Sequence, residues 1–302
     1  MISADWSAPL APFLWQVALH SSVMGLIFYA WVHRVGVPSG PAKRRLLAIL
    51  VVLPIVTAAI PGRASLEFTE RIAWLNSARL LAIPLPLGVH VYHVAYILGL
   101  LAIGLTIWQE VLPAFRHPRA STSEVPHGLL SLVRVRSGWE HCVVAISPMS
   151  SILLATAGVP GRPRLIVSQG ALDSLSSDEL EVVVAHEHAH WQSGRWLQSH
   201  ALFIARLLQC HSPVAMWVFR EYCIEVEIAC DADAVHGRDS HPLARVLLRI
   251  YQSTDRRDTA ARAAIRKRVD VLLAGGPQDS TLSTVSIVAA SVVMLLVLPW
   301  LV

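Results

Sequence analysis

Five consecutive residues constrain this chain more than any other feature: His186, Glu187, His188, Ala189 and His190. The two outer histidines are four positions apart, about 400° of helical rotation, so their imidazoles would leave one face of a helix one turn apart. Two imidazoles in that arrangement can bind one metal ion, and the carboxylate of Glu187 lies next to the first of them. The pattern predicts a metal site with an adjacent base, provided that these residues are helical. His188 points off the ligand face, and we expect it at the surface or on the substrate side.

The residues before the motif predict such a helix. Ser176 can cap its N-terminus, and Glu179 three residues later completes a capping box. The region before this helix has short apolar runs separated by glycine and proline, which predicts a small sheet of about four strands. These strands are expected at 129–135, 142–146, 151–158 and 164–168. The combination indicates an α+β domain.

A catalytic zinc ion needs three protein ligands and one open position. The extended motif HExxHxxGxxH would require glycine at 193 and histidine at 196, but this chain has Ser193 and Trp196 there. We therefore expect the third ligand farther along the chain, at Glu227. Asp231 follows one helical turn later and can orient a ligating histidine. The alternative interpretation is that these carboxylates form a solvated helix face.

The composition favours a membrane protein. Apolar residues make up 54% of the 302 residues and charged residues only 15%, whereas soluble domains carry about 25% charged residues. We expect four transmembrane helices, at about 12–32, 46–60, 89–112 and 283–302. Segment 64–82 has the pattern of an amphipathic helix on the outer surface.

Basic residues near the ends of these stretches indicate the orientation. They cluster after the first stretch, after the third and before the fourth. We therefore expect 1–113 to hold three transmembrane helices, 114–282 to be a cytoplasmic domain, and both termini to lie outside. The lipid bilayer is an expected partner. Basic and aromatic residues are not interleaved, so we expect no direct nucleic-acid binding, and we also consider a homodimer.

Several segments resemble the BlaR/MecR-type membrane metallopeptidases, metallopeptidase family 56. The similar segments are 163–170, Leu172, 178–181, 185–190 and 225–231, within a region of about 125–235. The resemblance implies a gluzincin fold for 114–282 in a bacterial inner or plasma membrane. It implies one zinc ion held by His186, His190 and Glu227, with Glu187 as the general base. An extended peptide substrate is then expected along an edge strand at Ile152, Leu153, Leu154, Ala155, Thr156 and Ala157.

The characterised members of this family act on a cytoplasmic winged-helix repressor. The resemblance therefore implies an integral-membrane zinc endopeptidase that cleaves a transcriptional repressor. Because the chain ends at Val302, we expect no outer sensor domain after the fourth span. His236 and Arg238 are candidates for stabilising the oxyanion or contacting the substrate. Two alternatives remain: an HtpX-like quality-control protease, and a signalling or scaffold membrane protein without proteolytic activity.

Overall fold

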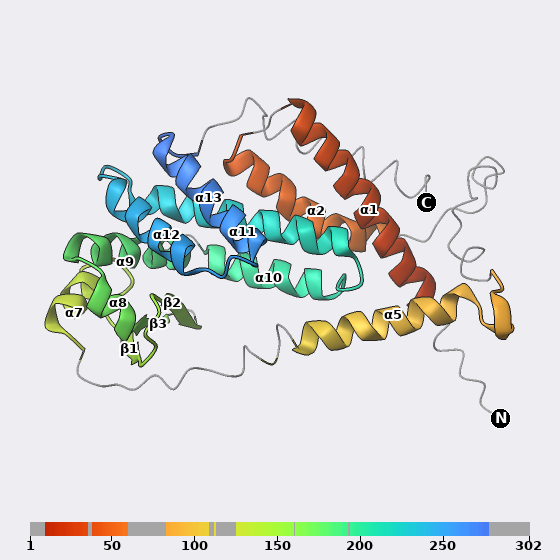
Figure 1. Cartoon of the computed structure of the whole chain (residues 1–302), viewed down its shortest axis with the longest axis horizontal. Helices are drawn as coiled ribbons and strands as arrows, with labels where there is room; N and C mark the ends of the chain where they lie inside the picture. The colour runs from red at the N-terminus through yellow and green to blue at the C-terminus, as the bar shows by residue number, and fades with distance from the viewer. Residues whose placement is uncertain are drawn as a thin grey trace. The chain divides into compact units, whose positions relative to one another are not determined.

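The computed structural model of the chain describes residues 10–35, 38–59, 83–108, 112, 125–159, 161–192 and 194–277. These residues are mostly helical and include a three-stranded mixed sheet (Figure 1). The chain divides into two compact units. Unit 1 contains Met1–Phe115, His200–Tyr222 and Asp279–Val302, and unit 2 contains Arg116–Ser199 and Cys223–Gln278. The segments 64–82 and 283–302, for which the sequence predicts an amphipathic helix and a fourth span, lie outside the described residues.

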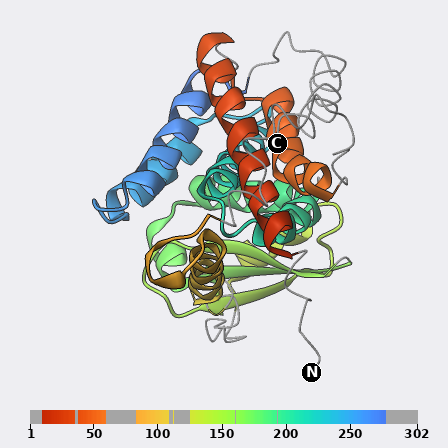
Figure 2. The ribbon, with the colours of Figure 1, turned by 90° about the vertical axis from the view of Figure 1, so that its right-hand side faces the viewer.

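The three apolar stretches of unit 1 form helices. These are α1 (Leu10–Val35), α2 (Pro41–Ala59) and α5 (Val91–Thr106), with the short 3-10 helix η3 (Pro86–Gly88) before α5. Helices α1 and α2 lie side by side (Figures 1 and 2), and His20 Nδ1 of α1 lies 2.8 Å from Thr57 Oγ1 of α2. Within the described ranges, no helix combines the length and the apolar character needed to cross a membrane. The predicted stretches are therefore helical, but their assignment as membrane spans is not confirmed.

The sheet of unit 2 has β3 (Arg162–Ser168) at its centre (Figure 1). Strand β1 (Val143–Ser147) runs parallel to β3, and β2 (Leu154–Val159) runs antiparallel along its other side. Strand β2 is thus an edge strand, as the family resemblance implies for 152–157, although it begins only at Leu154. Near the end of β2, Gly158 has φ +112°, and a Cβ added there would meet the Arg162 carbonyl oxygen, so this position favours glycine.

The segment predicted as a first strand at 129–135 is instead helix α7 (His127–Arg134), so that prediction is wrong. Leu129 and Val133 are both buried and lie four residues apart, which places them on one face of a helix. Apolar residues in a run this short fit either a strand or a helix, because periodicity cannot distinguish the two over seven residues. Packing against the sheet selects the helix.

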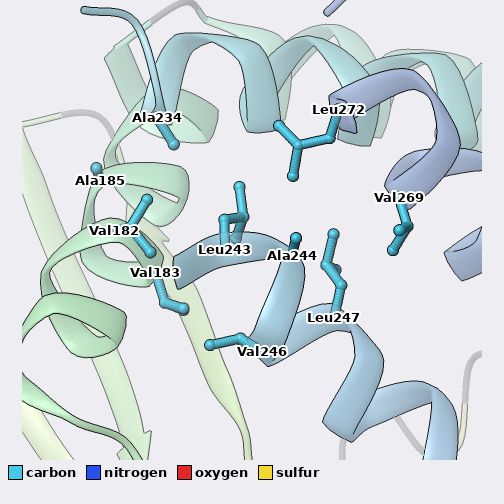
Figure 3. Close-up of a cluster of buried hydrophobic side chains, with 10 residues drawn as sticks. All are labelled: Val182, Val183, Ala185, Ala234, Leu243, Ala244, Val246, Leu247, Val269 and Leu272. Carbon is cyan, nitrogen blue, oxygen red and sulfur yellow. The ribbon is translucent and has the colours of Figure 1, made fainter. Parts of the chain in front are cut away.

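The remainder of the described chain is helical. It forms α8 (Gln169–Ser174), α9 (Ser177–Gln192), α10 (Arg195–Leu207), α11 (Pro213–Ala234), α12 (His241–Ser253) and α13 (Thr259–Leu273). Figure 3 shows an apolar cluster in which Val182, Val183 and Ala185 of α9 meet side chains of α11, α12 and α13. A second cluster joins Val184 of α9 to the sheet and α7. Helix α9 is therefore covered on two sides, which places the motif that it carries in the interior of unit 2.

Candidate metal centre and active site

The start of α9 is fixed by the predicted capping box. The backbone N–H of Ser176 donates to Glu179 Oε2 at 3.0 Å, and the N–H of Glu179 donates to Ser176 Oγ at 3.4 Å. The other carboxylate oxygen of Glu179 accepts hydrogen bonds from Arg245 and Arg249 of α12, each at 3.1 Å. One buried carboxylate therefore both caps α9 and ties it to α12. The position of the HExxH motif depends on both contacts.

Two helices bring three potential metal ligands together. His186 and His190 come from α9, and Glu227 comes from α11, where it lies beyond a long intervening stretch of sequence. The two Nε2 atoms are 3.2 Å apart, and each lies 3.3 Å from a carboxylate oxygen of Glu227. The structure thus brings together all three side chains that the sequence and the family resemblance select.

This arrangement fits zinc. In a tetrahedral site with zinc–ligand bonds of about 2.0–2.1 Å, neighbouring ligand atoms lie about 3.3 Å apart. The observed separations of 3.2 and 3.3 Å have that spacing. Two imidazole nitrogens and one carboxylate are also the protein ligands of His₂Glu zinc enzymes, which leave a fourth position open. The three donors are therefore consistent with an open zinc site of the kind that peptidases have.

The electrostatics of the cluster favour a bound cation. Burial alone would lower the pKa of His190, but hydrogen bonds with Cys230 and Glu227 outweigh burial and raise this pKa to about 9. Burial would also lower the pKa of His186. Hydrogen bonds and charge interactions with Asp231 and Glu227 outweigh burial and raise this pKa well above its ordinary value. Metal binding requires neutral imidazoles. Binding of a metal ion would therefore release the protons that the two histidines carry in its absence.

Asp231 and Arg268 contact the candidate ligands on the side away from the ligand cluster. Asp231 Oδ1 lies 2.8 Å from His186 Nδ1, the nitrogen that faces away from the ligand cluster. Asp231 therefore lies beside His186, as the sequence predicts, and its role in orienting this histidine stays a prediction. Arg268 of α13 donates to both carboxylate oxygens of Asp231, at 2.8 and 2.7 Å, and its Nη1 lies 3.0 Å from Glu227 Oε2. Arg268 therefore holds both acidic residues of the site.

Sequence reasoning missed Arg268. It belongs to a run of basic residues before the last apolar stretch, and such runs indicate membrane orientation. Its side chain is nevertheless only 16% exposed, because α13 turns it toward Asp231 and Glu227. The buried carboxylate of Asp231 on α11 needs a compensating cation. Nothing in the sequence indicates which of the neighbouring basic residues supplies it.

Glu187 is held by the edge strand. The backbone N–H and the hydroxyl of Thr156 both donate to Glu187 Oε2 at 2.8 Å, and the hydroxyl also lies 3.2 Å from the Glu187 carbonyl oxygen. The N–H of Thr156 thus points out of the sheet edge and toward the motif. Strand β2 contains Leu154, Ala155, Thr156 and Ala157 of the predicted substrate strand, whereas Ile152 and Leu153 precede it. Substrate pairing along this strand stays a prediction.

Three other predicted residues have different surroundings. His188 is only 8% exposed, its Nε2 lies 3.0 Å from the Ser137 carbonyl oxygen, and its ring meets Trp139 edge-on. It is therefore a core residue and not a surface one, because α9 is covered on two sides. Arg238 pairs with Glu181 at 2.7 Å, and His236 is exposed just after α11. The role of His236 and Arg238 at an oxyanion stays a prediction.

The fold and the site together define a class. An HExxH helix packed beneath an edge strand, with a glutamate from a second helix beside the two histidines, is the arrangement of a His₂Glu metallopeptidase. The family model described as BlaR1 peptidase M56 matches residues 14–271, most of the chain. The chain therefore belongs to the M56 peptidase family, which confirms the family expected from the sequence. No curated protein matches it significantly.

Proposed function

We propose that the protein is a zinc endopeptidase of the membrane that cleaves a protein substrate on the cytoplasmic side. The observation that carries this proposal is the convergence of His186, His190 and Glu227 at zinc-ligand distances, with Glu187 adjacent to the first ligand. The membership of the M56 family supports the reaction class. It also supports a transcriptional repressor of the winged-helix type as the substrate, as the family resemblance implies.

The chain's own residues divide the work of peptide hydrolysis. His186, His190 and Glu227 would hold the zinc ion, while Asp231 and Arg268 keep His186 and Glu227 in place. When bound, zinc supplies Lewis-acid polarisation of the scissile carbonyl and lowers the pKa of water. Glu187 accepts the proton of the attacking water at Oε1, because Oε2 already accepts from Thr156, and passes it to the departing amine. Thr156 fixes the carboxylate of Glu187 before the substrate arrives.

The location of β2 supports an extended peptide as the substrate. The outward N–H of Thr156 shows that the free edge of β2 faces Glu187. A peptide added to this edge would therefore pass close to the general base. Such pairing recognises the backbone of the substrate more than its side chains, which suits the cleavage of an exposed loop in a folded protein.

Exposed apolar side chains support residence in the membrane. On α5, Ile97, Leu98, Leu100 and Leu101 are between 57% and 68% exposed. A contiguous apolar surface of this kind is unfavourable in water and favourable in lipid. The positive-inside rule then supports a cytoplasmic catalytic domain with both termini outside.

The test is a substrate trap. Glu187→Gln removes the base, keeps the size of the side chain and leaves all three metal ligands unchanged. We therefore expect the zinc content to stay at the wild-type level and the cleavage rate to fall by at least about 100-fold. Full-length wild-type protein and variant are purified, their zinc is quantified, and proteins retained by each in membranes are identified by mass spectrometry. Asp178→Asn, at an exposed position in the first turn of the same helix, is the matched control and should behave as wild type.

The retained proteins decide between the candidate functions. A winged-helix repressor held by Glu187→Gln and cleaved by the wild type supports regulatory proteolysis. Damaged membrane proteins in its place would favour a quality-control role. Undiminished cleavage by Glu187→Gln would contradict the assignment of the base, and a wild-type protein that binds zinc but cleaves none of the retained proteins would contradict the protease itself.

A further inference from the structure

A basic pocket lies between α12 and α13, apart from the metal centre. Its volume is about 490 Å³, and the two helices that enclose it lie side by side (Figure 1). The polar side chains that line it and carry the argument are Tyr251, Arg256, Thr259, Arg262, Arg266 and Asp270. Three guanidinium groups therefore share one pocket with a single carboxylate among these residues.

The arginines of the pocket differ from the other basic residues nearby. Three arginines of α12 and α13 pair with the carboxylates of α9 and α11: Arg245, Arg249 and Arg268. Within the described part of the chain, Arg256, Arg262 and Arg266 form no ion pair with a carboxylate. Lys267 also lines the pocket, but it pairs with Glu225 at 3.0 Å. Among the described residues that line the pocket, the cations without a carboxylate partner are therefore the three arginines.

Tyr251 holds two of these charges close together. The guanidinium carbon of Arg262 lies 3.9 Å from the centre of the Tyr251 ring, and Arg266 donates to the Tyr251 hydroxyl at 3.1 Å. Arg262 also donates to the carbonyl oxygens of Tyr251 and Thr254, at 3.0 and 3.2 Å, which fixes its position. One helical turn separates Arg262 from Arg266, a spacing at which like charges repel each other. An anion between them would turn this repulsion into attraction.

We propose that this pocket binds a phosphate group, with the headgroup of an anionic phospholipid as the favoured source. Guanidinium groups bind phosphate oxygens through paired N–H donors, and the hydroxyl groups of Thr259 and Tyr251 add further donors. The apolar segment 283–302 begins shortly after α13 ends at Leu273, and basic groups next to such a segment meet the anionic headgroups of the membrane surface. The proposal does not depend on the zinc chemistry.

The test compares two neighbouring arginines. Arg256 lines the pocket and Arg257 does not, and both are exposed, so Arg256→Gln and Arg257→Gln remove the same charge from adjacent positions. The full chain in a non-ionic detergent is titrated with dioleoyl phosphatidylglycerol, and bound lipid is counted by native mass spectrometry, with dioleoyl phosphatidylcholine as the neutral comparison. A second arm titrates sodium phosphate against sodium chloride at constant ionic strength by calorimetry.

Loss of one charge-assisted contact should weaken phosphatidylglycerol binding about tenfold in Arg256→Gln and less than about twofold in Arg257→Gln. Arg266→Gln should resemble Arg256→Gln, and the thermal midpoint of each variant confirms that it is folded. Binding of phosphatidylglycerol alone identifies a lipid headgroup, and binding of sodium phosphate with the same dependence on Arg256 identifies free phosphate. Equal losses in Arg256→Gln and Arg257→Gln, or no binding of either probe, would overturn the proposal.

Discussion

At the scale of single residues, the metal centre is a balance of buried charges. Asp231 is only 2% exposed, and burial alone would raise its pKa, but Arg268 and His186 outweigh burial and keep this pKa below its ordinary value. Glu227 shares Arg268 with Asp231, and its pKa is also lowered. Each carboxylate therefore stays ionised beside the histidines. Ionised carboxylates are what a divalent cation and a correctly oriented imidazole both require.

Arg268→Met should therefore destabilise the metal-free protein. The substitution leaves the buried carboxylate of Asp231 without its bidentate partner, and we expect the free energy of unfolding to fall by about 3 kcal/mol. Arg266→Met, two positions earlier on α13 and exposed, should change it by less than about 0.5 kcal/mol. Urea denaturation in the presence of a chelator measures both. Equal effects of the two substitutions would show that Arg268 does not stabilise the protein more than an exposed arginine does.

At the scale of elements, Glu179 connects the start of α9 with α12. Its Oε2 atom completes the local capping box, and its Oε1 atom accepts from Arg245 and Arg249. Burial alone would raise the pKa of Glu179, but hydrogen bonds from Ser176 and Arg245 and the charge of Arg249 lower it below the ordinary value. A residue that the sequence presents as a helix cap is thus also a tertiary contact.

Glu179→Gln should lower the free energy of unfolding by about 2 kcal/mol at pH 7, because the cap and the charged contacts are both weakened. The folded-state pKa of Glu179 is depressed, so its contribution is present above its unfolded pKa of about 4.3 and is lost as the pH falls through the folded value. The difference between wild type and variant should therefore shrink below about pH 4. Denaturation curves across this range measure it, with Glu181→Gln as the control. A difference that does not depend on pH would contradict the assignment.

At the scale of the whole molecule, the metal site joins two separate stretches of unit 2. His186 and His190 belong to Arg116–Ser199, and Glu227 belongs to Cys223–Gln278, while the residues between these stretches belong to unit 1. A bound metal ion thus closes a long loop of chain. Because the ligands meet only in the folded state, the free energy of metal binding adds to the stability of unit 2.

Removal of zinc should lower the thermal midpoint of one unfolding transition, that of unit 2. At a free zinc concentration of about 100 times Kd, the stabilisation is about 2.7 kcal/mol. Scanning calorimetry of the full chain with zinc and with a chelator measures the shift. His190→Ala removes one ligand and should abolish the response to the chelator. A chelator effect that persists in His190→Ala would place the stabilising metal elsewhere.

Much of the site was predictable because its signals are local. The spacing of His186 and His190 on a capped helix requires only helical geometry, and Asp231 follows Glu227 at the same spacing. The strand prediction for 129–135 failed because a short apolar run has no distinct period. Arg268 and the contact of Thr156 with Glu187 could not be predicted, because each depends on which elements pack together.

The helix that carries HExxH and the membership of the family could be predicted from the sequence, because each follows from a local motif and its spacing. Packing alone reveals which residues support the ligands and which of the described basic residues lie apart from any carboxylate. The physical reason is burial. Whether a carboxylate or a guanidinium is compensated depends on neighbours that come from distant parts of the chain, and only packing brings α9, α11 and α13 to one place.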